Sequence, residues 1–589
     1  MDRAHGDTTD STRGDITSKA ARLERSLSLS PGVWLSSGAD AAHAAAMSLW
    51  NRDASLWSAA PDVQAKIAQR LGWMASPALM ARSIDRLTTF AEGVRHDGFT
   101  HVVLLGMGGS SLAPEVLRAV LGVGPEWPQF HMLDSTDPAA VRAIATPPDR
   151  TLYIIASKSG TTIEPNVLAA HFRERLESSG AIWPDHFVAV TDEGTELAAR
   201  ARADRFRDLF LNPSDIGGRY SAVSFFGLVP AALMGQDIRA IVEWALALLS
   251  AADPSRRGAA INPAVGLGAL MGHASRAGRD KLTLVLPPSL EAFGLWIEQL
   301  IAESTGKQGH GVVPIAGEHL GAPDSYDADR VFVRMTVGGT SSATPNGNVA
   351  GDLKASGAPV AEIDMPEPAA LGAEFLRWEI ATAICGALLR VNPFDEPNVQ
   401  QAKDATRTLL ARYGATGRLE APAGDTVASG ATLAATESAR TQLNGRGTDH
   451  LLTLLRPADY FVLLAYLGPD PELLQALQRF RASVRDRCRV ATMLGYGPRY
   501  LHSTGQLHKG GPNTGVFVVV TATPREDVSI PGEAFSFGTL ELAQAVGDFL
   551  SLDATGRRAA RVHLPRPDPR LIDEIAEAFL KALPQAPGR

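Results

Sequence analysis

Short continuous apolar runs and longer stretches with helical periodicity alternate along most of the chain. In the first clear unit, residues 100–122, the apolar run HVVLL leads through a glycine-rich loop into the amphipathic stretch LAPEVLRAVL. A second unit of the same layout covers residues 150–180, and a further strand is expected at 186–192. Because short buried strands that alternate with helices of this length are typical of βαβ units, we predict a parallel sheet within residues 91–240.

The same alternation returns further along the chain. Within residues 241–420 the pattern predicts helices and strands in turn, at 261–278, 281–287, 290–306, 330–337, 370–390 and 397–414. A stretch rich in glycine, alanine and threonine, 414–437, is expected to be a connection, and α/β alternation resumes in 438–589. We therefore predict the α/β class, with two doubly wound parallel-sheet domains, flanking helices and a C-terminal α/β segment.

The first residues of the chain contain no apolar core. Residues 1–20 are polar, which predicts a disordered lead and no secretory signal, and the rest of 1–90 has mostly helical spacing. The longest apolar run, 222–235, is short and contains a proline, so no membrane span is expected. The chain has two cysteines, Cys385 and Cys488, and neither a disulfide framework nor a cysteine zinc motif. Such cysteine usage is typical of a reducing compartment and predicts a cytoplasmic protein.

The charge balance narrows the choice of partner. The chain has 56 lysines and arginines against 64 aspartates and glutamates, which gives a net charge of −8. Because binding to a phosphate backbone favours a basic surface, we do not expect nucleic acid as the main partner. Any anionic ligand would have to be bound by a local pocket.

Four hydroxyl side chains and one lysine gather where the strand of the second unit ends, in the sequence SKSGTTIEP. A loop that joins a strand to a helix N-terminus presents unpaired amides to an anion, and the hydroxyls add further donors. We interpret this loop as a phosphate-binding site, although a polar N-cap loop without a ligand has the same composition. Its candidate binding residues are Ser157, Lys158, Ser159, Thr161 and Thr162.

The loop GMGGSS at 106–111 follows the first predicted strand and matches part of a dinucleotide-binding fingerprint. However, Ser111 stands at the third glycine position, and P-loop spacing is absent from the chain. We therefore expect no nucleotide cofactor. We interpret the loop as a close approach of the backbone to a small ligand at the carboxyl edge of the sheet.

Three residues are candidates for the chemistry of proton transfer. Gln299 and Glu303 lie four positions apart on a predicted helix that ends at Gly306, so they share one helix face. A solvated glutamate in the last turn is the alternative interpretation of Glu303. Arg219 follows two glycines, which would let its guanidinium approach a ligand and stabilise a developing oxyanion. A purely structural arginine is the alternative.

Two histidines and one lysine complete the candidates. His502 and His508 lie in a glycine-flanked loop, six residues apart and without a third metal ligand nearby, so metal binding is not expected. A histidine in this loop is either an acid–base group or a structural residue. Lys403 lies in the middle of a predicted helix, where a solvated lysine is the default.

Six stretches of the chain together resemble the glucose-6-phosphate isomerase family and, more broadly, the sugar-isomerase (SIS) domains that bind phosphosugars. They are GMGGSSLAPEV, SKSGTTIEP, GGRYSAVSFFGLVPAAL, EQLIAESTGK, NPFDEPNVQQAK and LHSTGQLHKGG. They cover roughly residues 100–405 and the loop near 502, and the likeness is greatest to the isomerase part of transaldolase–isomerase fusions. No transaldolase is expected, because its barrel needs about 250 residues and only about 90 precede the first predicted sheet.

The resemblance implies an enzyme that interconverts glucose 6-phosphate and fructose 6-phosphate through ring opening and a cis-enediolate, without a metal or another cofactor. It implies Glu303 as the general base and Arg219 as the group that stabilises the enediolate. His502 and Lys403 match the ring-opening pair. The remaining implied contacts are Ser157, Ser159, Thr162 and the Lys158 backbone at the phosphate, Gly109 and Ser110 near the sugar hydroxyls, and Gln299 close to the base.

In the family that the chain resembles, the histidine reaches the site from the neighbouring subunit, which implies a homodimer with shared active sites. Two features depart from the family pattern: the LHSTGQ motif follows Lys403 instead of preceding it, and Glu396 stands where many members carry glutamine. Since an extra negative charge near a phosphate is costly, we expect Glu396 to face away.

The rival hypothesis is a non-catalytic SIS-type regulator that binds a phosphosugar. Such a sensor needs the hydroxyl loop but has no use for Glu303, Arg219 and His502 together, so their joint presence favours the enzyme. Acceptance of mannose 6-phosphate as a further substrate is left open.

Overall fold

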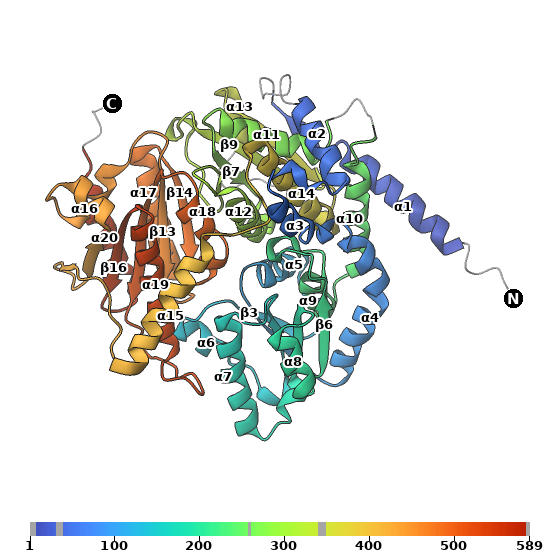
Figure 1. The fold of residues 1–589 in the computed structure, drawn as a ribbon, viewed down its shortest axis with the longest axis horizontal. Helices are drawn as coiled ribbons and strands as arrows, with labels where there is room; N and C mark the ends of the chain where they lie inside the picture. Colours follow the sequence, from blue (N-terminus) through green and yellow to red (C-terminus); the bar gives the residue numbers. More distant parts are fainter. Residues whose placement is uncertain (1–6, 31–38, 257–260, 340–348, 585–589) are drawn as a thin grey trace.

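Three β-sheets, each with helices packed on its faces, form the body of the protein (Figure 1). The computed structural model describes residues 7–30, 39–256, 261–339 and 349–584. Most strand pairs are parallel, which confirms the predicted α/β class. When the parallel strands of each sheet are counted in chain order, the spatial orders are 2-1-3-4-5, 2-1-3-4 and 2-1-3-4. These are doubly wound orders, so the C-terminal segment is a third unit of the same kind.

The first sheet has the strand order β3 (Gln129–Leu133), β2 (His101–Gly106), β4 (Thr151–Ala156), β5 (Phe187–Asp192), β6 (Asp208–Asn212). Strands β2, β4 and β5 are buried almost throughout because helices cover both faces, which explains their continuous apolar runs. The sequence pattern does not predict β3 and β6, which are partly exposed edge strands. The helices of this unit are α5 (Leu112–Leu121), α6 (Pro138–Ala143), α7 (Ile163–Ser179), α8 (Glu196–Ala203) and α9 (Phe225–Leu233).

The second sheet has the order β1 (Leu27–Leu29), β10 (Val360–Met365), β9 (Arg330–Val337), β7 (Lys281–Val285), β8 (Val313–Ile315). Its helices are α10 (Ile238–Ala251), α11 (Val265–Arg276), α12 (Glu291–Thr305), α13 (Val349–Ala355) and α14 (Leu371–Leu389). The predicted strands and helices of this unit are confirmed, with β9 at its predicted bounds. Strand β1 pairs antiparallel with β10, so the N-terminal region completes this sheet.

The N-terminal region packs mostly as helices around the first two units. These helices are α1 (Asp7–Leu23), α2 (Ala39–Trp50), α3 (Pro61–Ala68) and α4 (Ser76–His96). The predicted disordered lead is wrong for residues 7–20, which are helical because α1 docks on α10, with Lys19 Nζ 2.7 Å from Glu243 Oε2. The rest of that lead, residues 1–6, lies outside the described residues.

The third sheet has the order β11 (Asp425–Thr426), β12 (Thr432–Ala435), β16 (Arg558–Leu564), β15 (Gly515–Ala522), β13 (Tyr460–Tyr466), β14 (Ala491–Tyr496). The prediction of a plain connection at 414–437 is therefore wrong, because β11 and β12 lie within it and pair antiparallel. Their small residues hide the strand signal. The helices are α15 (Val399–Thr416), α16 (Glu437–Leu443), α17 (Pro471–Cys488), α18 (Gly505–Gly510), α19 (Phe537–Ala554) and α20 (Pro569–Lys581).

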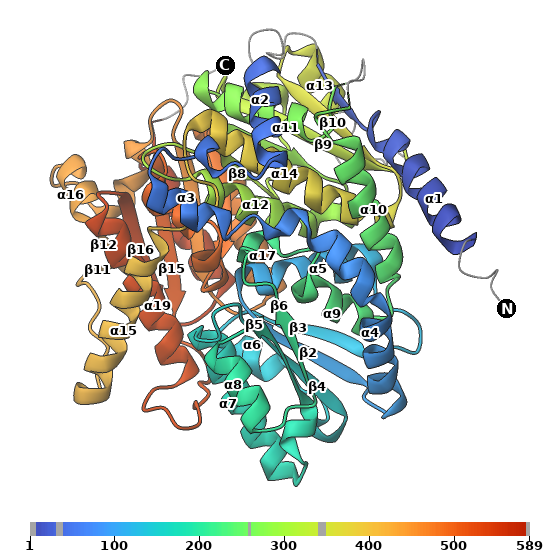
Figure 2. The same ribbon diagram turned by 45° about the vertical axis from the view of Figure 1, so that its right-hand side comes forward.

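The third unit packs on both of the others. Helix α19 shares an apolar core with the first sheet, where Leu540 and Val103 belong to one buried cluster, and it lies beside α15 (Figure 2). Toward the second unit, buried Glu318 accepts a hydrogen bond from Arg330 at 2.9 Å and one from Thr492 Oγ1 at 2.6 Å. Removing one partner of such a buried ion pair is costly, so these contacts hold the units in place. Within the described residues, no helix combines the length and the apolar character needed to cross a bilayer.

Candidate active site

A cavity of about 810 Å³ opens where the three units meet. The loops that follow β2, β4, β5 and β6 of the first sheet line it, together with the end of α12 and the loop that contains His502. The strand order of the first sheet reverses between β2 and β4, and ligands of doubly wound sheets bind at that point. Of the candidate residues, all except Ser157 and His508 line this cavity.

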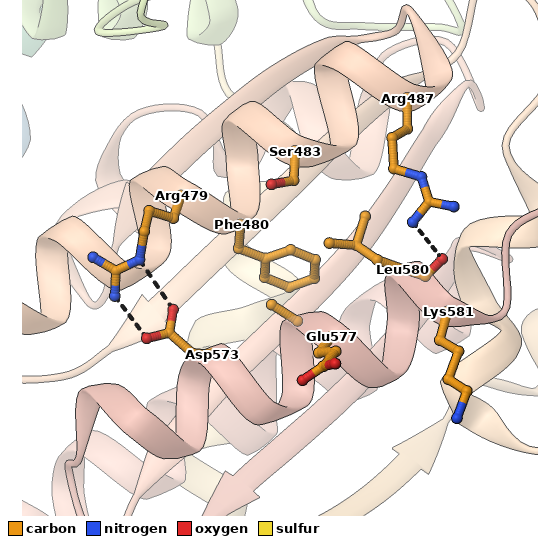
Figure 3. Close-up of a pocket in the computed structure, with 9 residues that line it drawn as sticks. Arg479, Phe480, Ser483, Arg487, Asp573, Glu577, Leu580 and Lys581 are labelled. Atoms are coloured by element: carbon orange, nitrogen blue, oxygen red, sulfur yellow. Dashed lines mark hydrogen bonds and ion pairs between the residues drawn. The ribbon is translucent and has the colours of Figure 1, made fainter. Parts of the chain in front are cut away.

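A second groove, of about 470 Å³, lies between α17 and α20 (Figure 3). Three of the charged side chains on its rim are already engaged: Arg479 Nη2 lies 2.7 Å from Asp573 Oδ2, and Arg487 donates to the Leu580 carbonyl at 2.9 Å. Phe480 lies between them (Figure 3). Because this groove includes none of the predicted site residues, the cavity between the three units is the candidate active site.

Two glycines let the loop after β2 pack tightly into the cavity wall. A Cβ atom on Gly108, whose φ is +54°, would lie 2.6 Å from the His502 carbonyl oxygen and 2.9 Å from Gln299 Nε2. A Cβ atom on Gly109 would lie 2.0 Å from the Gly218 carbonyl oxygen. At these two points the loop comes close to protein atoms, which draws the three units together around the cavity. The close approach of this loop to a small ligand stays a prediction.

The hydroxyl loop after β4 forms one end of the cavity. Ser159 and Thr161 are exposed, and Thr161 Oγ1 donates a hydrogen bond to Ser159 Oγ at 3.1 Å. Thr162 precedes α7 without capping it through its side chain. Ser157 lies beneath this surface: its hydroxyl is 3.0 Å from that of Thr162 and accepts the Gly160 amide at 3.1 Å. Exposed hydroxyls at a helix N-terminus are suited to bind a phosphate.

Two cations flank this loop in different ways. The Lys158 ammonium forms an ion pair with Asp192 and donates to the Ser214 carbonyl at 3.0 Å, so its charge is already compensated. Burial raises the pKa of Asp192, and the ion pair with Lys158 opposes that rise. Arg70 also lines the cavity, and sequence reasoning missed it because it lies outside every recognised motif.

Glu303 and Arg219 form a buried ion pair at the other end of the cavity. Glu303 lies in the last turn of α12, and its Oε1 is 3.0 Å from Arg219 Nη1. The two residues are 9 % and 4 % exposed, which excludes the solvated alternative for Glu303. Burial raises the pKa of Glu303, and the adjacent Arg219 opposes this rise. A carboxylate held in this way can act as a base near neutral pH.

Glu396 does not face away from the cavity, so that prediction is wrong. Its Oε2 accepts a hydrogen bond from Arg219 Nη1 at 3.1 Å, and the residue lines the cavity. Burial alone would raise the pKa of Glu396, but Arg219, together with Lys307 and Arg70, outweighs burial and holds the pKa below its usual value. The attraction to the guanidinium is the physical reason why an extra carboxylate is tolerated here.

His502 is held by a carboxylate that sequence reasoning missed. His502 Nε2 lies 2.9 Å from Glu164 Oε1, and the Gln544 amide donates to the same oxygen at 2.7 Å. Burial opposes the charged form of Glu164, but adjacent His502 outweighs this and lowers the pKa of Glu164. Glu164 stands within the SKSGTTIEP motif, so its place beside the hydroxyls was the signal that could have found it.

The histidine and the rest of this site belong to one chain. The third unit brings His502 to the cavity in cis, so the implied supply of this residue by a neighbouring subunit is wrong for this protein. The reason is the rearranged motif order, which places the LHSTGQ loop on an additional doubly wound unit that packs on the first two.

The remaining candidates differ in their surroundings. The Gln299 amide donates to the His502 carbonyl at 2.7 Å and to Glu303 Oε2 at 3.3 Å, so it links the base to the histidine loop. Lys403 is exposed at the cavity rim and forms no ion pair within the described part of the chain.

His508 is buried outside the cavity against Phe517, and burial holds its pKa well below the usual value, which favours the structural interpretation. Among the described residues no cluster of three or more histidines, cysteines or acids could hold a metal ion.

An exposed hydroxyl loop at a helix N-terminus that faces a buried carboxylate–guanidinium pair defines an α/β enzyme site for a small anionic substrate. A family model described as phosphoglucose isomerase matches residues 54–313. The chain is 31% identical over 374 residues to a glucose-6-phosphate isomerase of Rubrobacter xylanophilus, which covers 55% of this chain and 85% of that protein. The chain belongs to the glucose-6-phosphate isomerase family.

One further relative and one solved structure are also similar to this chain. A glucose-6-phosphate isomerase of Synechococcus sp. (strain CC9605) is 29% identical over 429 residues, which cover 63% of this chain and 79% of that protein. The crystal structure of a hypothetical protein from Thermus thermophilus, TT0462, superimposes with a TM-score of 0.53 and 24% identity. It covers 65% of this chain and 100% of that one, and it shows a shared fold. The His502 loop lies beyond the residues that the family model matches.

Proposed function

We propose that this chain interconverts glucose 6-phosphate and fructose 6-phosphate, with Glu303 as the base that moves the proton between C2 and C1. The observation that carries this proposal is the convergence of two pairs, Glu303 with Arg219 and His502 with Glu164, on one cavity with the hydroxyl loop. A protein that only bound a phosphosugar would not need the buried acid–base pair.

The hydroxyl loop is the proposed site of the phosphate. Ser159, Thr161 and Thr162 offer hydroxyl donors, and the first amides of α7 and the positive end of its dipole add to them. Because the ammonium of Lys158 is paired with Asp192, its backbone and not its side chain is the expected contact. Such an anchor fixes one end of the sugar and directs the other end toward the acid–base groups.

His502 is the proposed proton donor for ring opening. Protonation of the ring oxygen and removal of the proton from the C1 hydroxyl break the C1–O5 bond of the cyclic aldose and leave an open-chain aldehyde. The hydrogen bond that His502 donates to Glu164 fixes the imidazole, and Lys403 at the rim is the nearby cation of the implied pair.

Glu303 then removes the C2 proton of the open-chain aldose and returns it to C1. The negative charge that develops on the enediolate oxygens is stabilised by Arg219, whose guanidinium lies beside the base. One carboxylate that serves both carbons on one face explains why a single buried glutamate is enough. The reverse transfer regenerates the aldose.

The direct test is a coupled assay of fructose 6-phosphate conversion by wild type and Glu303→Gln. We expect the substitution to lower kcat by about 10²–10⁴-fold, the range of general base catalysis, because the amide cannot accept the proton. Glu298→Gln is the matched control, since Glu298 is another buried glutamate of α12 that does not line this cavity. Full activity of Glu303→Gln would remove Glu303 as the base.

The pH dependence gives an independent test of the same assignment. Because burial raises the pKa of Glu303, its basic form is lost as the pH falls through that raised value. We therefore expect kcat/KM of the wild type to decline on the acid side at a pH above the ordinary glutamate value of 4.5. An acid limb at or below that value would contradict the proposal.

The predicted homodimer and cytoplasmic location stay predictions. The presence of His502 in its own chain's cavity supports an active site that does not depend on a second copy. Activity per chain that stays constant on dilution through any dimer dissociation, followed by light scattering, would support this view. Cys385 and Cys488 are free thiols, in keeping with the reducing compartment expected from the sequence.

A further inference from the structure

The Arg219 guanidinium is surrounded by oxygen atoms of the chain itself. A guanidinium carries five N–H groups in a fixed planar arrangement. Arg219 donates four hydrogen bonds, to Ser304 Oγ at 2.8 Å, Pro393 O at 2.8 Å, Asp395 O at 3.0 Å and Glu396 Oε2 at 3.1 Å, and Glu303 Oε1 forms an ion pair with Nη1 at 3.0 Å. A substrate oxygen can take over one of these four hydrogen bonds only after the present acceptor has moved.

The five partners are not equally free to move. Two of them are backbone oxygens, and Ser304 is fully buried on α12. The two carboxylates share Nη1, but the Glu303 side chain is 12% exposed and the Glu396 side chain is 42% exposed. Glu396 also lies on a loop, in the residues just before α15, whereas Glu303 is fixed on a helix. Glu396 is the partner whose displacement costs least.

We propose that the Glu396 carboxylate is a stand-in for the substrate: it occupies the Arg219 hydrogen-bonding position that the enediolate oxygen takes during the reaction. This inference rests on the proposed role of Arg219 as the enediolate partner. Glu396 keeps the buried guanidinium oriented while the site is free, and an anionic oxygen of the substrate displaces it. Glu396 is thus a positioning residue, and its displacement is part of forming the reactive complex.

The charges around Glu396 fit such an exchange. Arg70 lines the same cavity and offers a second cation to a displaced carboxylate. Lys307 is buried near Arg219 and is bound to Asp395 at 2.7 Å, so the loop that contains Glu396 stays anchored while its side chain turns. Arg70, Lys307 and Arg219 attract the Glu396 carboxylate, whereas Glu303 repels it. This arrangement favours a carboxylate that can move between Arg219 and Arg70.

The experiment compares two probes on the folded protein by isothermal titration. The first is an anionic analogue of the enediolate, a sugar-phosphate hydroxamate, and the second is a hexitol 6-phosphate, which has no charge at that position. In Glu396→Gln we expect the anionic probe to bind about tenfold more tightly, because a neutral amide competes less well than a carboxylate for a charged donor. The hexitol phosphate should change by less than about threefold.

Three variants separate the possible outcomes. Glu396→Ala should also favour the anionic probe, and it guards against an effect peculiar to the amide. Glu193→Gln removes a negative charge from the same cavity without touching Arg219, so it should change the affinity for the anion less than Glu396→Gln does. If both Glu396 variants leave the affinity for the hydroxamate unchanged or lower it, the stand-in role is overturned. Arg219→Lys tests the underlying role of Arg219 separately. Full turnover by this variant would refute Arg219 as the enediolate partner, whereas a loss of its turnover, with Glu396 variants that bind the hydroxamate as the wild type does, would refute only the stand-in.

Discussion

The two ends of the active-site cavity are built on opposite principles. At the phosphate end, one short loop supplies the hydroxyls, and Ser159 and Thr161 are exposed and bonded mainly to each other. At the proton-transfer end, the groups come from all three units, and Arg219, Glu303 and Glu164 are buried with their polar atoms already engaged.

The difference shows which part of the site needs side chains in a fixed orientation. A phosphate can be bound by any set of nearby donors, so an exposed loop at a helix N-terminus is enough. A developing enediolate needs charges that are oriented before the reaction, and those charges tolerate burial only when each has a partner. Substitutions should therefore act mainly on kcat at the buried end and mainly on KM at the exposed end.

The largest effect in this comparison is expected for Arg219→Lys. Lysine keeps the positive charge but cannot reproduce the five contacts of the guanidinium, so both the enediolate and the neighbouring carboxylates lose their partner. We expect kcat to fall by about 10²–10³-fold, as for loss of an oxyanion donor, with a small change in KM. Steady-state kinetics with fructose 6-phosphate measure this split, and Arg202→Lys, an exposed arginine paired with Glu193, is the control. A change confined to KM would show that Arg219 acts in substrate binding and not in the proton transfer.

The next effect is expected for His502→Ala, which tests the part of the buried end that the third unit supplies. Without the imidazole we expect about a 10²-fold loss of kcat/KM on the cyclic sugar phosphate. The loss should be much smaller on an aldose phosphate that is too short to close a ring. His450→Ala, a half-exposed histidine of the same unit, serves as the control. Equal losses on both substrates would refute the ring-opening role.

A smaller effect of the same kind is expected for Gln544→Leu. Gln544 lies on α19, donates to Glu164 Oε1 at 2.7 Å and accepts from Thr136 Oγ1 at 2.8 Å, so it ties the first unit's carboxylate that holds His502 to the third unit. We expect about a tenfold loss on the cyclic substrate, because the histidine is less well positioned but still present. The short-chain substrate should be converted as by the wild type. A purely structural role for Gln544 would reduce both activities together and lower the melting temperature in parallel.

The same contrast explains what could be predicted from the sequence. The residues of the hydroxyl loop are contiguous in the sequence, so the composition of the loop and its position after a strand were enough to predict it. Strands β2, β4 and β5 could be predicted because each is a continuous apolar run. The buried end depends on contacts between distant segments: Gln544 meets Glu164 across 380 positions, and no local pattern marks such a pair. The orientation of Glu396 was missed for a similar reason, since the charge that attracts it, Arg219, lies 177 positions away.

The smallest effects are expected at the exposed end, for Ser159→Ala and Thr161→Val. Each hydroxyl is one of several donors around the phosphate, and its loss leaves the neighbouring hydroxyls and the first amides of α7 in place. We expect KM to rise severalfold, by up to about tenfold for a hydrogen bond to a charged group, while kcat stays within about twofold of wild type. Inorganic phosphate as a competitive inhibitor should weaken in proportion, which ties the loss to phosphate binding. Ser179→Ala at the far end of α7 is the matched control, because its hydroxyl bonds only to the Leu176 carbonyl. A fall in kcat with unchanged KM would show that this loop orients the reacting carbons, and the division of labour between the two ends would then have to be abandoned.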